Sequence, residues 1–315
     1  MQANIKKHHW LDYFVKSSGA GPTQVHFLFS FFIAVTVFCF SGYYRSEILN
    51  TLLRVSPKWV SAGLFCYGLN YSLRAFRLRI LSGRRINFLP HAIYASSLHG
   101  FMTYMIPFQV GDVSLPVILK SVHGIDLSEG SAILIRSRLL DMISLGGLML
   151  AASTISEIDL AISLRLLWFA IGGILLIVPF LLRRMIASHW FQSQRFGRLL
   201  KPFAQAGKFN IIECLLSLGI WAAVASVFFC VARAINLPIG FGGILLVISI
   251  QLPLQIIPVQ GVANTGNHEG GWIAALALLG VPLSQSAEFA VTSHIIILLY
   301  VLALGVVSLI AGRFK

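Results

Sequence analysis

Two acidic residues that lie inside apolar stretches are the first candidates for chemistry in this sequence. Asp112 follows a break marked by Pro107 and Gly111, and Glu269 follows a break that begins at Pro258. A carboxylate within a membrane segment is costly to bury, so it is by default a functional candidate. Either acid could couple to a proton or cation, or bind a cationic or hydroxylated headgroup. The simpler alternative is a helix start, because the helix dipole also favours an acid there.

The second break is longer and more polar than the first. Gly261 opens it, and Asn264, Gly266 and His268 lie between that glycine and Glu269. Backbone N–H groups in such a turn could bind a phosphate, as they do at helix N-termini. His268 and Glu269 could also form a proton-exchanging pair. The alternative is a flexible loop outside the membrane.

A basic motif, Arg136-x-Arg138-x-x-Asp141, opens a later apolar segment. Guanidinium groups bind phosphate through two parallel hydrogen bonds, so both arginines are candidate headgroup ligands. Arg138 and Asp141 are three residues apart and can pair on one helix face. The alternative is a cytoplasmic anchor with a local ion pair.

Other polar residues complete the candidate set. We expect an arginine cluster to bind anionic lipid without specificity, glutamines to line a polar cavity, and three residues in apolar runs to relay protons or to be satisfied locally. The arginine cluster is Arg74, Arg77, Arg79, Arg84 and Arg85. The glutamines are Gln109, Gln260, Gln251 and Gln255, and the three residues in apolar runs are Glu213, His99 and His294.

The sequence contains no HExxH, Walker, GxSxG or CxxC motif. Its longest segment between apolar runs, residues 183–210, is too short for a soluble catalytic domain. The four cysteines lie in apolar runs, where cysteine usually acts as a small buried apolar residue. We therefore expect no enzymatic activity, no cofactor and no metal site.

The composition indicates which elements must position these residues. Of the 315 residues, 57% are hydrophobic and 11% are charged, and the mean hydropathy is +0.82. Soluble chains carry about 25% charged residues, so these values exclude a soluble enzyme, a disordered tail and a secreted disulfide scaffold. The net charge of +13 is spread over several loops, which argues against nucleic-acid binding. We expect an all-α polytopic membrane protein.

A membrane-spanning helix needs about 20 apolar residues, and six segments qualify. The first is longer than the roughly 7–15 apolar residues of a signal peptide, so we expect it to be retained. Residues 1–24 before it are polar and basic, and we expect them to be cytoplasmic. The six predicted spans are 25–44, 58–76, 131–153, 162–182, 211–232 and 289–311.

Two apolar stretches, 90–120 and 242–281, are interrupted by polar turns. Lipid does not tolerate unpaired backbone, so a broken segment must pack inside protein or line a cavity. We therefore expect two opposed re-entrant hairpins. Their predicted turn residues are Pro107 and Gly111 in the first, and Pro258, Gly261 and Gly266 in the second.

The order span, span, hairpin, span occurs twice along the chain. Three crossings per half is an odd number, so the halves should have opposite orientations in the membrane. We expect one transmembrane domain over residues 1–315, built from inverted repeats at 25–153 and 162–311. Broken segments at corresponding places in two such halves indicate a transporter's binding site.

The positions of the charged residues test this topology. With a cytoplasmic N-terminus, most lysines and arginines lie on the cytoplasmic side, including those at the C-terminus, as the positive-inside rule requires. A full span at 87–110 would reverse every later loop and place the basic loop 183–208 outside. The charges therefore favour a hairpin at 90–120.

Three motifs together are similar to a known family: Pro107-x-x-x-Gly111-Asp112, Arg136-x-Arg138-x-x-Asp141, and the turn from Pro258 to Glu269. They resemble the membrane region of lysylphosphatidylglycerol synthases and its free-standing flippase-like relatives over nearly the whole chain. The family usually has Gly-Glu followed by an arginine in the first turn, where this chain has Asp112 and Leu115. The aminoacyl-transferring domain is not found in these residues, so the resemblance implies lipid translocation rather than lipid aminoacylation.

These observations predict an inner-membrane protein of a prokaryote, with both termini cytoplasmic, that translocates a glycolipid or modified phospholipid between leaflets. Membrane lipids, anionic ones among them, are the expected partners, together with a lipid-modifying enzyme. The alternatives are an ion-coupled transporter of a small soluble substrate, an enzyme acting on lipid-linked sugars, and an accessory partner of a synthase.

Overall fold

The computed structural model is helical throughout the part of the chain that it describes. It describes residues 32–33, 35–37, 39, 42–86, 89–107, 110–156, 161–193, 203–204, 208–255 and 261–312. The expected N-terminal segment, 1–24, lies outside these residues, as does most of the predicted first span. The turn residues Pro258 and Gln260, and Gln109 in the first turn, also lie outside them.

Five of the predicted spans each correspond to one long helix. The long helices are α4 (Pro57–Leu81), α7 (Leu127–Ile155), α8 (Ile162–Ile186), α12 (Ile211–Ala234) and α15 (Leu283–Ala311). Among the described residues, α8, α12 and α15 are long and apolar enough to cross a membrane by those criteria alone. The other two carry charged residues in their interiors, and several of these form the site below.

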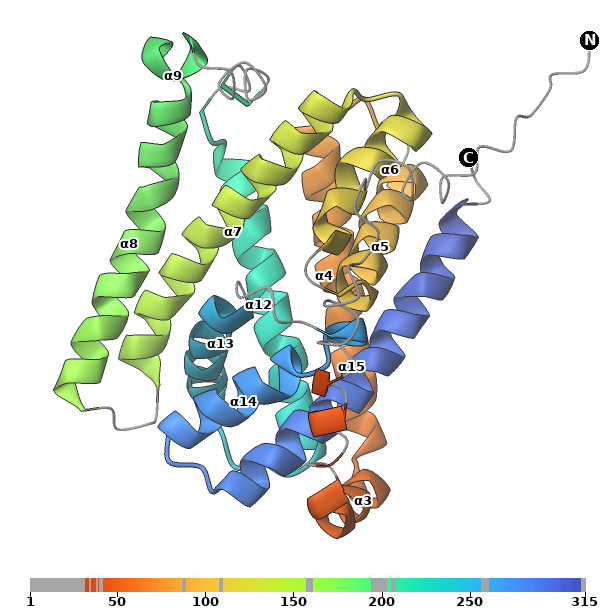
Figure 1. The fold of residues 1–315 in the computed structure, drawn as a ribbon, viewed down its shortest axis with the longest axis vertical. Helices are drawn as coiled ribbons and strands as arrows, with labels where there is room; N and C mark the ends of the chain where they lie inside the picture. Colours follow the sequence, from red (N-terminus) through yellow and green to blue (C-terminus); the bar gives the residue numbers. More distant parts are fainter. Residues whose placement is uncertain are drawn as a thin grey trace, which may run out of the picture.

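Shorter helices occupy the two interrupted stretches. They are α5 (Leu89–Met105), η1 (Val110–Val113) and α6 (Ser114–His123) in the first, and α13 (Phe241–Gln255), η2 (Val262–Asn264) and α14 (Asn267–Leu278) in the second. The short helices α3 (Arg45–Arg54) and α9 (His189–Ser193) lie at opposite ends of the molecule (Figure 1). At 1.5 Å per residue, the 15 residues of α13 extend about 22 Å, less than the ~30 Å hydrocarbon core.

Two helices from different parts of the chain, α4 and α12, pack side by side through the centre. Around them, α5 packs against α15 and α13 packs against α7, so each interrupted stretch contacts a long helix far from it in sequence. In Figure 1 the α5–α6 pair occupies the upper part of the molecule and the α13–α14 pair the lower part. The turn η2 also contacts α5.

The core is divided in the same way. One apolar cluster joins α12 to the second interrupted stretch and α15, around the fully buried Trp272 and Phe289. A second joins α4 to the first stretch and the start of α7, around Leu119 and Ile133. Each interrupted stretch is thus packed within protein, as backbone away from water requires.

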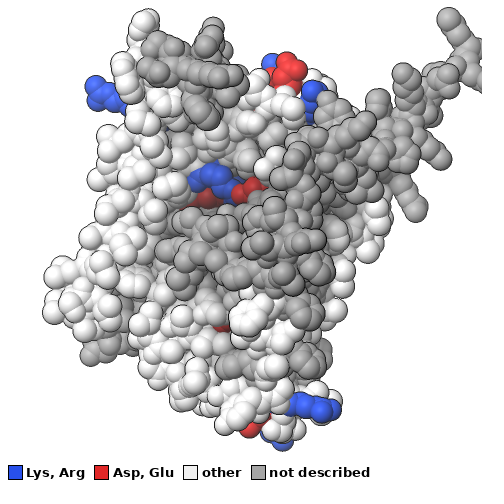
Figure 2. Space-filling model, viewed as in Figure 1, with Lys and Arg blue, Asp and Glu red and all other residues white. Residues whose placement is uncertain are grey.

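Charged atoms on the face shown in Figure 2 lie mainly at the two ends of the molecule. Away from the ends they form one cluster of basic and acidic atoms in a recess, with a small acidic spot below it. The helix at the edge of the molecule, α8, exposes apolar side chains such as Leu166 (62% exposed) and Ile177 (59% exposed). Such an apolar belt between two charged ends is typical of a protein surrounded by lipid.

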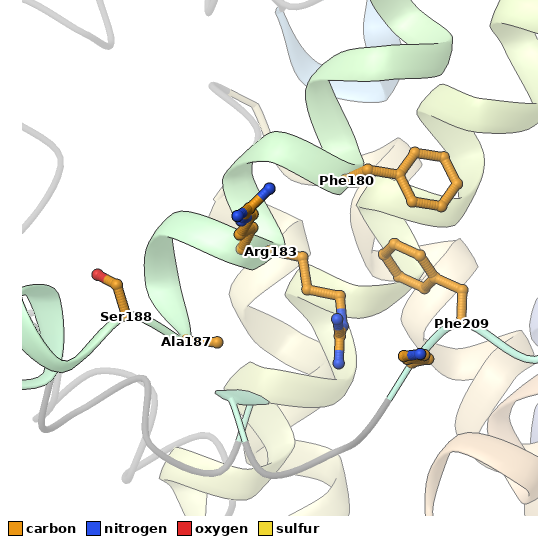
Figure 3. A pocket seen from close by; sticks show the side chains of 7 residues that line it. Phe180, Arg183, Ala187, Ser188 and Phe209 are labelled. Carbon is orange, nitrogen blue, oxygen red and sulfur yellow. The ribbon is translucent and has the colours of Figure 1, made fainter.

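The segment before α12 lies close to the C-terminal end of α8. A cavity of about 660 Å³ opens between them, lined by basic and aromatic side chains (Figure 3).

The contact between α7 and α8 depends on glycine at Gly146. A Cβ there would lie 2.7 Å from the Gly172 carbonyl oxygen and 3.0 Å from the Leu176 backbone nitrogen. The next residue, Gly147, has no atom of another element within 4 Å of the same position. The two glycines therefore form a matched pair, one at a contact and one in open space.

We expect Gly146→Ala to lower the free energy of unfolding by about 1–3 kcal/mol, because backbone atoms of α8 must move to admit the methyl group. Gly147→Ala is the control, and it should leave stability unchanged or raise it by up to about 1 kcal/mol, since alanine favours a helix. Thermal unfolding in detergent measures both. Equal shifts in the two variants would contradict the close approach.

Candidate functional site

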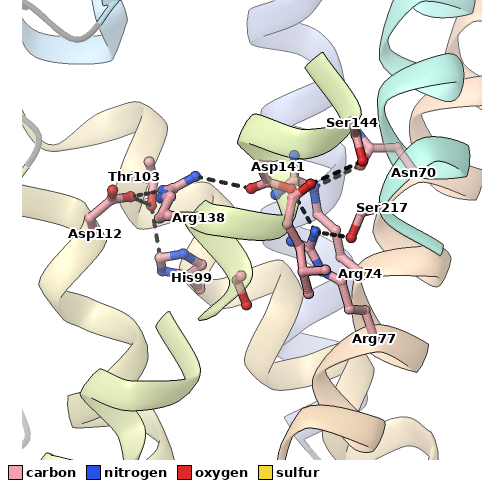
Figure 4. Close-up of polar contacts among 12 residues, drawn as sticks. Asn70, Arg74, Arg77, His99, Thr103, Asp112, Arg138, Asp141, Ser144 and Ser217 are labelled. Atoms are coloured by element: carbon pink, nitrogen blue, oxygen red, sulfur yellow. Dashed lines mark hydrogen bonds and ion pairs between the residues drawn. The ribbon is translucent and has the colours of Figure 1, made fainter. Parts of the chain in front are cut away.

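A row of charged side chains crosses the molecule at the first break (Figure 4). The Arg138 guanidinium on α7 forms an ion pair with Asp112 of η1 and lies 3.6 Å from Asp141 Oδ2. On the other side, Arg77 Nη1 of α4 lies 2.5 Å from Asp141 Oδ1 and donates to Ser217 Oγ of α12 at 2.8 Å. The row therefore joins four elements in the order η1, α7, α4 and α12.

The two ends of this row differ in exposure. The Arg77 and Asp141 side chains are 4% and 6% exposed, whereas those of Arg138 and Asp112 are 42% and 29% exposed. A buried ion pair stays together mainly because either charge alone would be strongly unfavourable in the protein interior. The exposed pair can exchange partners at much lower cost, so it is the part of the row that can bind a ligand.

The position of Asp112 is set by a close approach of two elements. A Cβ at Gly111 would overlap the α5 backbone at Met102 and Thr103, so the turn can lie against α5 only with glycine at this position. Thr103 Oγ1 donates to Asp112 Oδ1 at 3.4 Å. His99, one helical turn earlier on α5, is hydrogen-bonded to Ser114 Oγ at 2.9 Å.

A second acid–base pair lies at the second break. Glu269 lies in the first turn of α14, where one carboxylate oxygen accepts from the Gly266 backbone N–H at 2.8 Å. Its other oxygen is hydrogen-bonded to His294 Nδ1 of α15. His294 Nε2 lies 2.8 Å from the Ala263 carbonyl oxygen in η2. Both side chains of the pair are buried, since Glu269 is 5% and His294 6% exposed.

The hydrogen bonds of His294 determine where a proton lies. A carbonyl oxygen only accepts, so Nε2 must carry a hydrogen and donate it to Ala263. The contact between Nδ1 and the Glu269 carboxyl then needs a second proton, held by the imidazole or by the carboxyl group. This arrangement allows the pair to share one proton in the protein interior.

The two pairs have the same plan. Each joins the acid that follows a break to a base in the next long helix, and the separations are 26 residues for Asp112 and Arg138 and 25 for Glu269 and His294. The two sites also adjoin, since consecutive residues at the end of α5 face them. Thr103 contacts Asp112, and the Tyr104 hydroxyl interacts with Asn264 and Glu269.

The structure brings together most of the predicted site residues. Asp112, Arg138 and Asp141 share the first row, and Asn264 and Glu269 share the second cluster. The predicted turn residues also lie in the connections: Pro107 is two residues after the end of α5, Gly111 is in η1, Gly261 precedes η2, and Gly266 precedes α14. Gln109, Pro258 and Gln260 are outside the described residues.

Two of the predicted site residues, Arg136 and His268, have other partners than the sequence predicts. Arg136 does not join Arg138, because residues two apart on a helix point to different sides. Arg136 instead binds Glu213 of α12 (Nη2 to Oε2, 2.8 Å) and the Lys208 carbonyl oxygen at 2.7 Å. His268 is hydrogen-bonded to Ser293 Oγ at 2.9 Å, and His294 takes the place expected for it beside Glu269. The two imidazole rings stack with centroids 4.8 Å apart.

Arg77 corrects the sequence analysis most clearly. The sequence predicts that it binds anionic lipid with the other arginines of its cluster, but it is buried and bonded to Asp141. Its position was signalled by Asn70 and Arg74, which precede it by seven and three residues and form a polar stripe on one face of α4. Among the described residues, no group of three or more His, Cys, Asp or Glu side chains could hold a metal ion.

The family comparison agrees with the motifs that form these two clusters. The family model described as lysylphosphatidylglycerol synthase TM region matches residues 24–305. The chain belongs to this family. It is therefore an integral membrane protein of a family associated with lipid metabolism or translocation. A search of curated proteins finds no match.

Removing one member of the buried pair of Arg77 and Asp141 should lower the free energy of unfolding far more than removing both. We expect Asp141→Leu to lower the free energy of unfolding by about 3–5 kcal/mol, because Arg77 keeps a buried charge without its main partner. The double variant Arg77→Met with Asp141→Leu should recover most of that loss, since both charges are then gone.

The exposed pair of Arg85 and Glu129 is the control, with side chains 60% and 32% exposed. Replacing it by Met and Leu, singly or together, should change stability by no more than about 1 kcal/mol. Urea or thermal unfolding in detergent measures the cycle. If the double variant of the inner pair is less stable than Asp141→Leu, the account of that pair is wrong.

Proposed function

We propose that this protein translocates a polar-headed membrane lipid between leaflets, and that the headgroup passes the paired sites at the two breaks. The observation that carries this proposal is the partly exposed ion pair of Asp112 and Arg138, held in place by the buried pair of Arg77 and Asp141. A recess with basic and acidic atoms, on a face with few other described charged side chains between its ends, suits a headgroup whose chains remain in lipid (Figure 2).

The proposal includes two opposed re-entrant hairpins in an inverted repeat. Three features support it: helices too short to span alone, the reciprocal packing of α5 on α15 and α13 on α7, and the same acid–base plan at both breaks. In this topology the end of the molecule with Arg84, Arg183 and Arg184 faces the cytoplasm, following the positive-inside rule. The membrane is then the inner membrane of a prokaryote.

Each pair has a distinct role in the proposed cycle. Arg138 binds a phosphate or other acidic group of the lipid, and Asp112, freed from it, accepts hydrogen bonds from an amine or hydroxyl group. The second pair holds one proton between Glu269 and His294. Loss of that proton, or a change of partner, would give the second site a negative charge and alter its affinity for the headgroup as the protein changes state.

One observation favours a second candidate, an ion-coupled transporter of a small soluble substrate. At the opposite end of the molecule, a cavity of about 340 Å³ has a polar lining that includes Glu47, Arg54, Asn236 and Glu288. Water-soluble solutes could enter there without lipid. Transport of a lipid by the purified protein separates this candidate from lipid translocation.

We expect Asp112→Asn and Glu269→Gln each to reduce lipid translocation at least tenfold, because each removes the carboxyl group that binds its basic partner. The assay uses proteoliposomes that contain tail-labelled phosphatidylglycerol, phosphatidylethanolamine or glucosyldiacylglycerol, with a membrane-impermeant quencher added outside. Glu129→Gln is the matched control, because Glu129 is an acid outside both clusters, and it should transport at the wild-type rate.

Two results would contradict the proposal. One is wild-type protein that moves none of the three lipids faster than empty liposomes while it takes up a soluble substrate. The other is lipid transport that survives in both Asp112→Asn and Glu269→Gln. Unfolded variants are recognised by a lowered thermal unfolding temperature and are replaced by Arg138→Lys and His294→Gln.

A further inference from the structure

The cavity at the C-terminal end of α8 is separate from both acid–base clusters. It has three basic side chains, Arg183, Arg184 and Lys208, and no acidic residue is among the described residues that line it. The remaining wall includes the Phe180 and Phe209 rings, which contact each other edge to face with centroids 5.5 Å apart (Figure 3). The cavity thus combines positive charge with an apolar, aromatic side.

One wall of this cavity is fixed from inside the protein. The buried Arg136 side chain donates to the Lys208 carbonyl oxygen at 2.7 Å, and its guanidinium carbon lies 5.3 Å from the Phe209 ring centroid. Glu213 holds the same guanidinium with two hydrogen bonds, from Nε at 3.0 Å and from Nη2 at 2.8 Å. The segment that carries Lys208 and Phe209 is therefore held at the end of α8 independently of any ligand.

The opposite wall continues into the lipid-facing surface of α8. Ile177, Phe180 and Arg184 are spaced at i, i+3 and i+7, so they lie along one side of the helix, and all three are exposed. One turn before Ile177, a Cβ at Gly173 would meet no neighbouring atom within 4 Å. This side therefore leads from open apolar surface to positive charge over about two helical turns.

We propose that this cavity binds the phosphate of an anionic glycerophospholipid, with an acyl chain lying along α8 beside Gly173 and Ile177. Basic pockets at the cytoplasmic side of membrane helices bind such headgroups through charge, and the apolar stripe supplies contact with the chain. A soluble phosphate would satisfy the same basic side chains but would leave the stripe unused. The site also gives Arg136 a positioning role in place of direct headgroup contact. The cytoplasmic position of the site rests on the topology proposed above, but the site does not depend on lipid translocation, because its lining is separate from both acid–base clusters.

The test compares lipid binding to two matched double variants. Native mass spectrometry of the detergent-purified protein, titrated with phosphatidylglycerol, cardiolipin or phosphatidylcholine, gives the affinity for each lipid. We expect the two anionic lipids to bind more tightly than phosphatidylcholine. Arg183→Gln with Arg184→Gln should weaken anionic lipid binding about tenfold or more. Arg45→Gln with Lys58→Gln removes the same charge from two exposed side chains at the opposite end of the molecule and should leave the affinity unchanged.

A second variant and a second ligand keep the proposal falsifiable. Lys208→Gln should weaken anionic lipid binding severalfold even if the double variant unfolds. Inorganic phosphate at millimolar concentration should neither displace phosphatidylglycerol nor raise the unfolding temperature. The proposal is overturned if phosphate does either in an Arg183- and Arg184-dependent way, if phosphatidylcholine binds equally well, or if the control variant loses as much affinity as the test variant.

Discussion

Arg77 and Asp141 are both buried, and in surroundings without water neither charge is tolerable alone. Their pairing joins α4 to α7, and the hydrogen bond from Arg77 to Ser217 adds α12. Three long helices are thereby held in one register by polar contacts that lipid cannot replace. The same logic applies to Arg136 and Glu213, which join α7 to α12 nearer the end of the bundle.

The partly exposed pair of Asp112 and Arg138 depends on these buried ion pairs for its position. Asp141 contacts both Arg77 and Arg138, so the buried pair positions the arginine that reaches Asp112 in the recess. At the second break the corresponding base is a histidine, and its partner acid also closes the first turn of α14. A guanidinium stays charged, whereas an imidazole can gain or lose a proton. We infer that the first site provides constant charge for a headgroup and the second provides a change of charge.

Local sequence patterns were enough to locate the elements and the acids. Runs of apolar residues marked five long helices, and polar interruptions marked the short ones, because both signals lie within one segment. The same local patterns do not predict which residues pair with the acids. Arg77 is 64 residues from Asp141, and Glu213 is 77 residues from Arg136, so no spacing rule connects them. The local rule found only the weaker contact of Asp141, with Arg138 at 3.6 Å. His268 was expected beside Glu269 because it is adjacent in sequence, but neighbouring residues on a helix point in different directions.

In the proposed topology, the two interrupted stretches enter the membrane from opposite sides and bring their acids together inside it. Single cysteines in a variant without Cys39, Cys66, Cys214 and Cys230 test it, with labelling by an impermeant maleimide in right-side-out and inside-out vesicles. The positions flank the stretches: Arg84→Cys and Asp126→Cys for the first, Pro238→Cys and Gln285→Cys for the second. We expect the cysteines at positions 84 and 126 to label only from the cytoplasmic side, and those at 238 and 285 only from the opposite side. If the two cysteines of either pair label from different sides, that stretch is a full span and the proposed topology is wrong.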